Sequence, residues 1–200
     1  MRIIAGSARG IRLAAPEGRQ TRPVLDRVKE SWFAVLGPRL DGARALDLYA
    51  GIGSLGLEAL SRGAASCVFV ESSRECVSRL RGHLDAARLA GRAEVLARPV
   101  EAALAGLAAS GARFDIIFVD PPFALVPDAA LASAASLLDE HDGLMMLRRE
   151  AARRGAASPV PEPAGLSLAD RRVWGRSEVL FWDRAASAAP AAGGGPEGTA

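Results

Sequence analysis

From residue 44 onward, short apolar runs alternate along the chain with longer amphipathic segments. An apolar run bounded by turn residues is typical of a buried strand, whereas apolar residues spaced three and four apart indicate a helix. Strands that alternate with helices form parallel βαβ units, so the pattern predicts an α/β fold with a doubly wound, mostly parallel sheet. The expected strands are 44–50, 67–72, 93–98, 114–120 and 144–147, and the expected helices are 54–63, 73–91, 100–110 and 127–140.

The two ends of the chain differ from this alternating region. Residues 2–16 alternate apolar and polar side chains around two glycines, which predicts a short β-hairpin. Residues 166–175 and 178–183 are expected to pair antiparallel and to close one edge of the sheet. Residues 23–37 carry apolar side chains at helical spacing behind an early proline, namely Val24, Val28, Trp32 and Val35.

Charge divides the chain in the same place. Residues 1–44 hold nine Arg and Lys against four Asp and Glu, a balance of +5, so with a total of +2 the remainder carries −3. Such asymmetry is compatible with a polyanionic partner and with an ordinary solvated basic face. We expect a basic N-terminal lobe at 1–40 and an α/β domain at 41–184. Residues 185–200 are rich in Ala, Gly and Pro without periodicity and are expected to be disordered.

Targeting signals and cysteine usage restrict the location and the chemistry. The N-terminus has no uninterrupted apolar leader, and nothing approaches eighteen consecutive apolar residues, which argues against secretion and against a membrane span. Cys67 and Cys76 belong to no Cys-x-x-Cys or Cys/His cluster, so we expect neither a metal site nor a disulfide framework. A cytoplasmic protein is predicted. His83 and His141 stand alone in sequence and are expected to be structural or surface residues.

A glycine-rich segment follows the first expected strand. In 47-DLYAGIGSLGLEAL-60, Gly51, Gly53 and Gly56 satisfy G-x-G-x-x-G, which allows a tight turn and close approach of backbone to a ligand. Glu71 ends the next strand, where a carboxylate commonly accepts hydrogen bonds from ribose hydroxyls. The pattern fits a nicotinamide dinucleotide and S-adenosylmethionine equally well. Asp47, four residues before Gly51, favours the sulfonium cofactor because a carboxylate would repel a phosphate.

The stretch 114-FDIIFVDPPF-123 ends an expected central strand in a carboxylate, two prolines and an aromatic ring. Such an ending contributes little to stability, because proline cannot donate a ladder hydrogen bond. Ligands of open α/β sheets bind beyond the carboxyl ends of the strands. The residues of this ending are therefore candidates for chemistry in the same cleft as the glycine motif.

Several motifs in order carry a family resemblance. They are R-I-I-x-G-x-x-R-G at 2–10, R-P-x-x-D-R-V-K-E at 22–30, the glycine motif at 47–63, DPPF at 120–123, and the end strand at 174–180. The chain from Arg2 to Trp182 resembles the RsmD-type guanine-N2 methyltransferases of bacterial small-subunit ribosomal RNA. It departs from the family pattern at Val24, Ala34 and Pro99, and in 147-LRRE-150, which lacks an acid directly after the fifth strand.

The resemblance implies a Rossmann-like methyltransferase fold that uses S-adenosylmethionine, needs no metal, and acts as a monomer on 16S rRNA or on the assembling small subunit. It implies a catalytic group of Asp120, Pro121, Pro122 and Phe123. The implied cofactor residues are Asp47, Tyr49, Gly51, Gly53, Gly56, Glu71, Val100 and Asp120. The candidate phosphate contacts in the basic lobe are Arg9, Arg12, Arg22, Arg27 and Lys29.

Guanine N2 is a weak nucleophile, so orientation matters more than a strong base. Asp120 and the carbonyl of Pro121 would accept its two N–H groups, and Phe123 would stack on the base. Other amine or amide substrates, in another nucleic acid or in a protein glutamine, stay open. A nicotinamide-dependent oxidoreductase lacks an evident hydride-relay pair, since Tyr49 is the only tyrosine. A non-catalytic RNA-binding module would require a degenerate cleft, which the intact glycines argue against.

Overall fold

The computed structural model describes residues 1–14, 26–123, 125, 127–152 and 159–184. Side chains of residues 26–28 are not described. The predictions for Arg22 and for the tail at 185–200 therefore lie outside the described residues. The helices are α1 (Asp26–Leu36), α2 (Ser54–Ser61), α3 (Arg74–Ala86), α4 (Val100–Ala109) and α5 (Asp128–Leu137), with short 3-10 turns η1 (Gly37–Leu40) and η2 (Ala90–Arg92).

The described strands form one seven-stranded sheet in the order β3-β2-β1-β4-β5-β7-β6. The first five strands are parallel to one another, whereas β7 runs antiparallel to β5 and to β6. The predicted doubly wound, mostly parallel sheet with an antiparallel edge is confirmed. The strands are β1 (Arg44–Leu48), β2 (Ser66–Val70), β3 (Ala93–Leu96), β4 (Ile116–Val119), β5 (Leu144–Glu150), β6 (Leu166–Trp174) and β7 (Ser177–Arg184).

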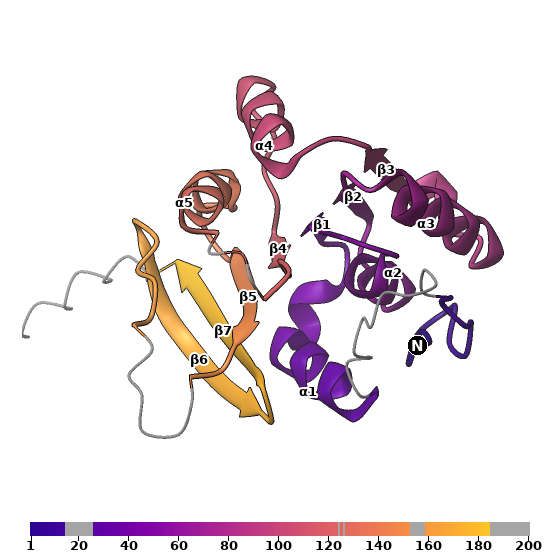
Figure 1. Ribbon diagram of the computed structural model, residues 1–200, viewed down its shortest axis with the longest axis horizontal. Helices are drawn as coiled ribbons and strands as arrows, with labels where there is room; N and C mark the ends of the chain where they lie inside the picture. The colour runs from indigo at the N-terminus through magenta and orange to yellow at the C-terminus, as the bar shows by residue number, and fades with distance from the viewer. Residues whose placement is uncertain (15–25, 124, 126, 153–158, 185–200) are drawn as a thin grey trace, which may run out of the picture.

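Two hydrophobic clusters cover the two faces of the sheet, as alternating strand residues point to opposite sides. In β4, for example, Ile116 and Phe118 enter the cluster that holds α1, α2 and α3. Their neighbours Ile117 and Val119 enter the cluster that holds α4 and α5. The helices therefore lie in two layers around the sheet (Figure 1).

The N-terminal segment is tied to α2 through one buried carboxylate. Both oxygens of Glu58 are saturated: Oε2 accepts from the backbone N–H of Ile4 and lies 2.9 Å from Nζ of Lys29, and Oε1 accepts from Ala5 N–H and from Arg62 Nε. Lys29 Nζ also donates to the carbonyl of Arg2 over 2.8 Å. Glu58 and Lys29 are almost completely buried. We call this group the Glu58 hub.

The predicted hairpin at 2–16 is present in its described part, up to residue 14, and it packs against α2. Arg2 and Arg12 form an antiparallel bridge, Ile3 N–H donates to the carbonyl of Ile11, and Leu13 N–H donates to the carbonyl of Met1. The N–H groups of Ile4 and Ala5 are used by Glu58, and Gly6 approaches α2 so closely that a Cβ there would lie 1.7 Å from the carbonyl oxygen of Ser61. The prediction of a short hairpin is therefore confirmed over the described residues, and its outward backbone groups bind α2.

The inward face of α1 also differs from the prediction. The buried residues are Lys29, Trp32, Phe33 and Leu36, whereas Val35 is only partly buried. The face is thus rotated from the predicted line through Val28, Trp32 and Val35. Trp32 and Phe33 join the same cluster as residues of β1, β2 and α2. The N-terminal segment and the α/β domain therefore share a core.

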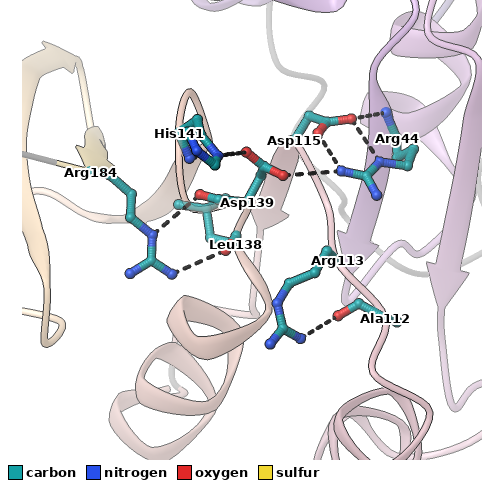
Figure 2. Close-up of polar contacts among 8 residues, drawn as sticks. All are labelled: Arg44, Ala112, Arg113, Asp115, Leu138, Asp139, His141 and Arg184. Carbon is teal, nitrogen blue, oxygen red and sulfur yellow. Dashed lines mark hydrogen bonds and ion pairs between the residues drawn. The ribbon is translucent and has the colours of Figure 1, made fainter. Parts of the chain in front are cut away.

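An ionic cluster fastens the opposite, amino-terminal edge of the parallel strands (Figure 2). Arg44, at the start of β1, donates to Asp115 over 2.7 Å and lies 3.3 Å from Asp139. The hydrogen bond from Arg44 is the main reason that the pKa of Asp115 is lowered. Arg184 donates to the carbonyls of Leu138 and Asp139 beyond α5. This edge is stabilised by pairs that leave little free charge for a ligand.

The described helices include none that is long and apolar enough to cross a membrane. Across the described ranges, no group of three or more His, Cys, Asp and Glu is placed to hold a metal ion. Cys67 and Cys76 are buried, and no disulfide joins them.

Candidate active site

Three charged residues meet on one face at the carboxyl ends of β1, β4 and β5. Residues two apart in a strand point to the same face of the sheet. Asp47 in β1 therefore lies on the face of Ala45, and Asp120, just after β4, lies on the face of Phe118. Arg148 in β5 lies on the face of Met146, which is the same face. Val119 pairs with Leu147, so the next residues, Asp120 and Arg148, become neighbours. The topology therefore brings these side chains together at the edge where open α/β sheets bind ligands.

The three glycines of the motif have different structural roles. Gly51 has φ of 55°, and a Cβ there would meet no atom within 4 Å, so its surroundings are open. Gly53 caps α2 with φ of 84°, and a Cβ would lie 2.3 Å from Leu80 Cδ1. A Cβ on Gly56 would lie 2.3 Å from Phe69. Gly53 and Gly56 thus allow close packing, and Gly51 leaves room for a ligand against the backbone.

Asp47 is a buried carboxylate beside this turn. Its Oδ2 accepts from Gly56 N–H over 2.9 Å, and the residue is 1% exposed. Burial is the main reason that the pKa of Asp47 is raised to about 8; the Gly56 hydrogen bond lowers it, and the nearby charges of Asp120 and Glu71 add to the rise. A cationic ligand would compensate this charge, which an anionic phosphate would not.

Glu71 holds the glycine turn from the end of β2. Its Oε2 accepts from Gly51 N–H over 2.8 Å, and its Oε1 accepts from Ser73 N–H over 2.6 Å. Each carboxylate oxygen has a second lone pair, so Glu71 can still accept hydrogen bonds from a ligand. The carboxylate is therefore both a support for the turn and a candidate partner for hydroxyl groups.

Tyr49 and Val100 occupy different environments. Tyr49 has φ of 60°, which is a strained conformation for a non-glycine residue, and its buried hydroxyl has no hydrogen-bond partner among the described residues. Burial raises the pKa of Tyr49, with a smaller contribution from Glu101. Val100 begins α4 and packs its side chain into the core. Only its backbone is thus placed to face a ligand.

The DPPF ending places its four residues unequally. Pro121 is buried, Pro122 is exposed, and Asp120 and Phe123 are partly buried. Arg148 donates from Nε to Asp120 Oδ1 over 2.5 Å, and its guanidinium carbon lies 5.2 Å from the centre of the Phe123 ring. Burial raises the pKa of Asp120, and Arg148 opposes that rise. The structure therefore brings Arg148, a residue outside the motif, into contact with two residues of the predicted group.

The residues predicted to contact phosphate lie in different environments. Arg9 and Arg12 are exposed in the N-terminal segment, as a phosphate contact requires. Arg27 belongs to α1, but its side chain is among those not described. Lys29 is 1% exposed and its ammonium group belongs to the Glu58 hub. The prediction that Lys29 binds phosphate is wrong, because a buried and paired ammonium group cannot reach a polyanion.

His83 joins two parts of the chain that the sequence did not suggest are in contact. Ala14 N–H donates to its Nε2 over 3.0 Å, so Nδ1 carries the ring hydrogen and donates to the carbonyl of Ile52, 3.1 Å away. Ile52 lies inside the glycine turn. The buried imidazole therefore links the N-terminal segment to that turn, which agrees with the expectation of a structural residue. No local sequence signal reveals either partner, because both lie far along the chain.

Comparison with known proteins gives concordant matches. Residues 1–183 match the family described as conserved hypothetical protein 95. The chain is 36% identical to a putative rRNA methyltransferase, YlbH, of Bacillus subtilis, over 92% of this chain and 99% of that protein. It is 43% identical to ribosomal RNA small subunit methyltransferase D of Escherichia coli, over 62% of this chain and 60% of that protein.

Solved structures support the same relationship. The putative methyltransferase yhhF from Escherichia coli superimposes with a TM-score of 0.76 at 35% identity, covering 93% of this chain and 98% of that one. The agreement extends through the N-terminal segment as well as the α/β domain. With a match from residue 1 to residue 183, the chain belongs to the family described as conserved hypothetical protein 95.

Proposed function

We propose that this protein transfers a methyl group from S-adenosylmethionine to the exocyclic N2 amine of a guanine in 16S rRNA of the small ribosomal subunit. Relatives in its family are named rRNA methyltransferases and ribosomal RNA small subunit methyltransferase D. The observation that carries the proposal is Asp120, a carboxylate at the end of β4 that shares one face with Asp47 and the glycine turn. The guanine-N2 position comes from the resemblance of the DPPF motif.

The glycine turn and its carboxylates fit the methyl donor. The open space beside Gly51 admits the ligand against the backbone, and Glu71 can accept from ribose hydroxyls. Asp47 offers a buried carboxyl group whose ionised form a cationic donor would favour. When bound, S-adenosylmethionine supplies an electrophilic methyl group on a sulfonium. Tyr49 and the start of α4 at Val100 complete the proposed cofactor group.

The DPPF residues act on the amine. Asp120 and the Pro121 carbonyl accept hydrogen bonds from the two N–H groups of N2. These bonds fix the nitrogen for in-line attack and direct its lone pair at the methyl group. Phe123 stacks on the extruded base. The proton leaves after the new C–N bond has formed, because an aromatic amine becomes strongly acidic once it carries a positive charge. The residues therefore orient the amine and do not need to deprotonate it first.

The N-terminal segment is proposed to position the RNA through its phosphates. Arg9 and Arg12 are exposed side chains of a segment that the Glu58 hub holds against α2. Phosphate contacts of this kind fix the register of a nucleic acid without reading its sequence. We propose that residues 1–40 contact RNA and that the protein acts as a monomer in the cytoplasm on rRNA or on the assembling subunit.

Nucleoside mass spectrometry tests the proposed reaction. A strain that lacks this protein should lose one N2-methylguanosine from its 16S rRNA, and purified protein with S-adenosylmethionine should restore it to that rRNA or to isolated small subunits. Titration calorimetry should detect binding of S-adenosylmethionine and no heat from NAD. A product methylated on a ribose hydroxyl or a ring carbon would refute the assignment, as would tight binding of NAD.

Asp47→Asn is expected to stabilise the free protein and to weaken donor binding. The folded-state pKa of Asp47 is raised to about 8, so stability falls as the pH rises from the unfolded value of 3.8 towards 8, and asparagine removes this loss. We expect the melting temperature at pH 8.5 to rise by roughly 2–6 °C. Loss of the charge should weaken S-adenosylmethionine binding by about 10- to 100-fold.

The pH dependence supplies the control for Asp47. In the unaltered protein, affinity for the cationic donor should increase as the pH rises through about 8, because the ionised carboxylate binds the cation. The Asn variant should lose this increase. Calorimetry from pH 6.5 to 9 with both proteins measures it, and an identical pH profile would show that Asp47 does not face the donor.

Charge reversal at Arg9 and Arg12 is expected to weaken RNA binding and its dependence on salt. When a phosphate contact is lost, binding releases fewer counterions. The slope of log affinity against log salt concentration should therefore become shallower by about 1–2 in the double variant. Filter binding of 16S rRNA across a salt series measures the slope. Arg113→Glu, at the opposite edge of the sheet (Figure 2), is the matched control and should leave it unchanged. Equal slopes in all three proteins would reduce Arg9 and Arg12 to a solvated face.

A further inference from the structure

Arg148 makes two contacts at the DPPF ending that converge on one position. Its Nε lies 2.5 Å from Asp120 Oδ1, and its guanidinium carbon lies 5.2 Å from the centre of the Phe123 ring. Both ion-pair side chains are only 18% exposed. A planar group with N–H donors is thus bonded to the carboxylate and placed over the aromatic ring.

The fold imposes this placement. Pairing of Val119 with Leu147 makes Asp120 and Arg148 neighbours at the ends of adjacent parallel strands. Strand alternation directs both side chains to the face of Met146 and Phe118. Arg148 therefore reaches Asp120 directly from β5, because Asp120 is the first residue after the neighbouring strand β4.

The proposed function assigns the same two partners to the target base. Guanine would give an N–H of its amine to Asp120 and its ring face to Phe123. A guanidinium and a base cannot make both contacts from one place. We infer that Arg148 holds the target-base position closed in the free protein, as an internal mimic of guanine, and moves out when the base enters. This inference rests on the proposed function.

Displacement of the Arg148 side chain by the incoming base favours bases that carry an exocyclic amine. In the closed state the partly buried Asp120 carboxylate is neutralised by Arg148, which opposes the effect of burial on its pKa. A base that carries an exocyclic amine restores a hydrogen bond to Asp120 and stacks on Phe123. A base without an amine restores only the stacking and leaves Asp120 without a donor, which is unfavourable at a buried site. Arg148 thus acts as a specificity-determining residue.

Arg148→Met tests the inference because methionine keeps an apolar stem and removes the guanidinium. In the unaltered protein only the open fraction binds the base, so the closed state weakens the apparent affinity in proportion to that fraction. Arg148→Met removes the closed state, so we expect the KM for small subunits to fall about 3- to 10-fold, with kcat nearly unchanged. Binding of 2-aminopurine riboside, measured by its fluorescence without any methyl transfer, should tighten by a similar factor. Arg176→Met, an exposed arginine in the β6–β7 turn, is the control and should change neither value.

A small cation gives the second test. In Arg148→Ala, added methylguanidinium should refill the vacated position and inhibit competitively with RNA, whereas the unaltered protein should be insensitive at the same concentration. The inference is overturned if Arg148→Met leaves KM and riboside binding unchanged, if it lowers kcat, or if methylguanidinium raises turnover of Arg148→Ala. Failure of the proposed function is distinct: the unaltered protein would form no N2-methylguanosine, while riboside binding would still report on Arg148.

Discussion

Replacing Asp120 with alanine is expected to lower the rate of methyl transfer by about 100- to 1000-fold, as loss of one preorganised polar partner does in other enzymes. The carboxylate is the only side-chain acceptor in the DPPF motif, and Asp120 directly follows β4, with its N–H bonded to the carbonyl of Leu48 in β1. Without it the amine would keep a single acceptor, the Pro121 carbonyl, and would lose its alignment with the methyl group. Single-turnover kinetics with small subunits and saturating S-adenosylmethionine measure this rate directly.

Two further variants separate catalysis from folding. Asp120→Asn keeps one acceptor oxygen and should retain more activity than the alanine variant. Asp128→Ala removes an exposed carboxylate eight residues later, in the first turn of α5, and should keep near-normal turnover. Donor affinity should barely change in any of them, because the proposed donor site consists mainly of the glycine turn, Asp47 and Glu71. Near-full turnover of Asp120→Ala would show that this carboxylate does not orient the substrate.

The fold was predictable because its signals are local. Alternation of apolar runs with helical periodicity depends on neighbours within a few residues, and each expected strand from residue 44 onward has a counterpart in the sheet. The ends of the helices were less predictable. Helix α3 stops at Ala86 although the periodic pattern continues, because Arg88 adopts φ of 56° and Leu89 N–H bonds back to the carbonyl of Leu84. Glycine usually marks such an ending, and arginine gives no signal.

The errors at the N-terminus have a long-range cause. Lys29 was assigned to the surface from its charge alone, and charge does not report burial. Its spacing from Trp32, Phe33 and Leu36 is that of one helical face, which was the available signal. What decides its burial is Glu58, a residue of α2 that by sequence belongs only to the glycine motif.

Part of the site needed three-dimensional information. Asp47, Glu71 and Asp120 could be proposed from their places at strand ends, and the predicted roles of these residues stay predictions. Arg148 could be seen only as a departure from the family pattern. Its partners follow from the register of β4 against β5, since Val119 pairs with Leu147. Register between strands 25 or more residues apart is set by tertiary packing, so no local pattern revealed the contact.

Glu58→Ala is expected to lower the free energy of unfolding by about 3–5 kcal/mol, because it leaves the ammonium group of Lys29 buried without its carboxylate. It also removes the acceptor of the Ile4 and Ala5 N–H groups. In a protein of this size, the melting temperature should fall by roughly 6–20 °C. Urea unfolding followed by circular dichroism measures the free energy. Residues 1–14 should also become more sensitive to proteolysis, because the Glu58 hub fastens them to α2.

Glu75 provides a matched control for Glu58. Both residues pair with an arginine four positions later on the same helix, Arg62 and Arg79, but Glu58 is fully buried whereas the Glu75 side chain is 58% exposed. An exposed pair of this kind contributes about 0.3–0.5 kcal/mol, so Glu75→Ala should barely change unfolding. Lys29→Met, which removes the buried cation, should be less damaging than Glu58→Ala, since Arg62 and two backbone donors still satisfy the carboxylate. If Glu58→Ala were as mild as Glu75→Ala, burial of the hub would not be what fastens the N-terminal segment, and Arg9 and Arg12 would lose their fixed platform.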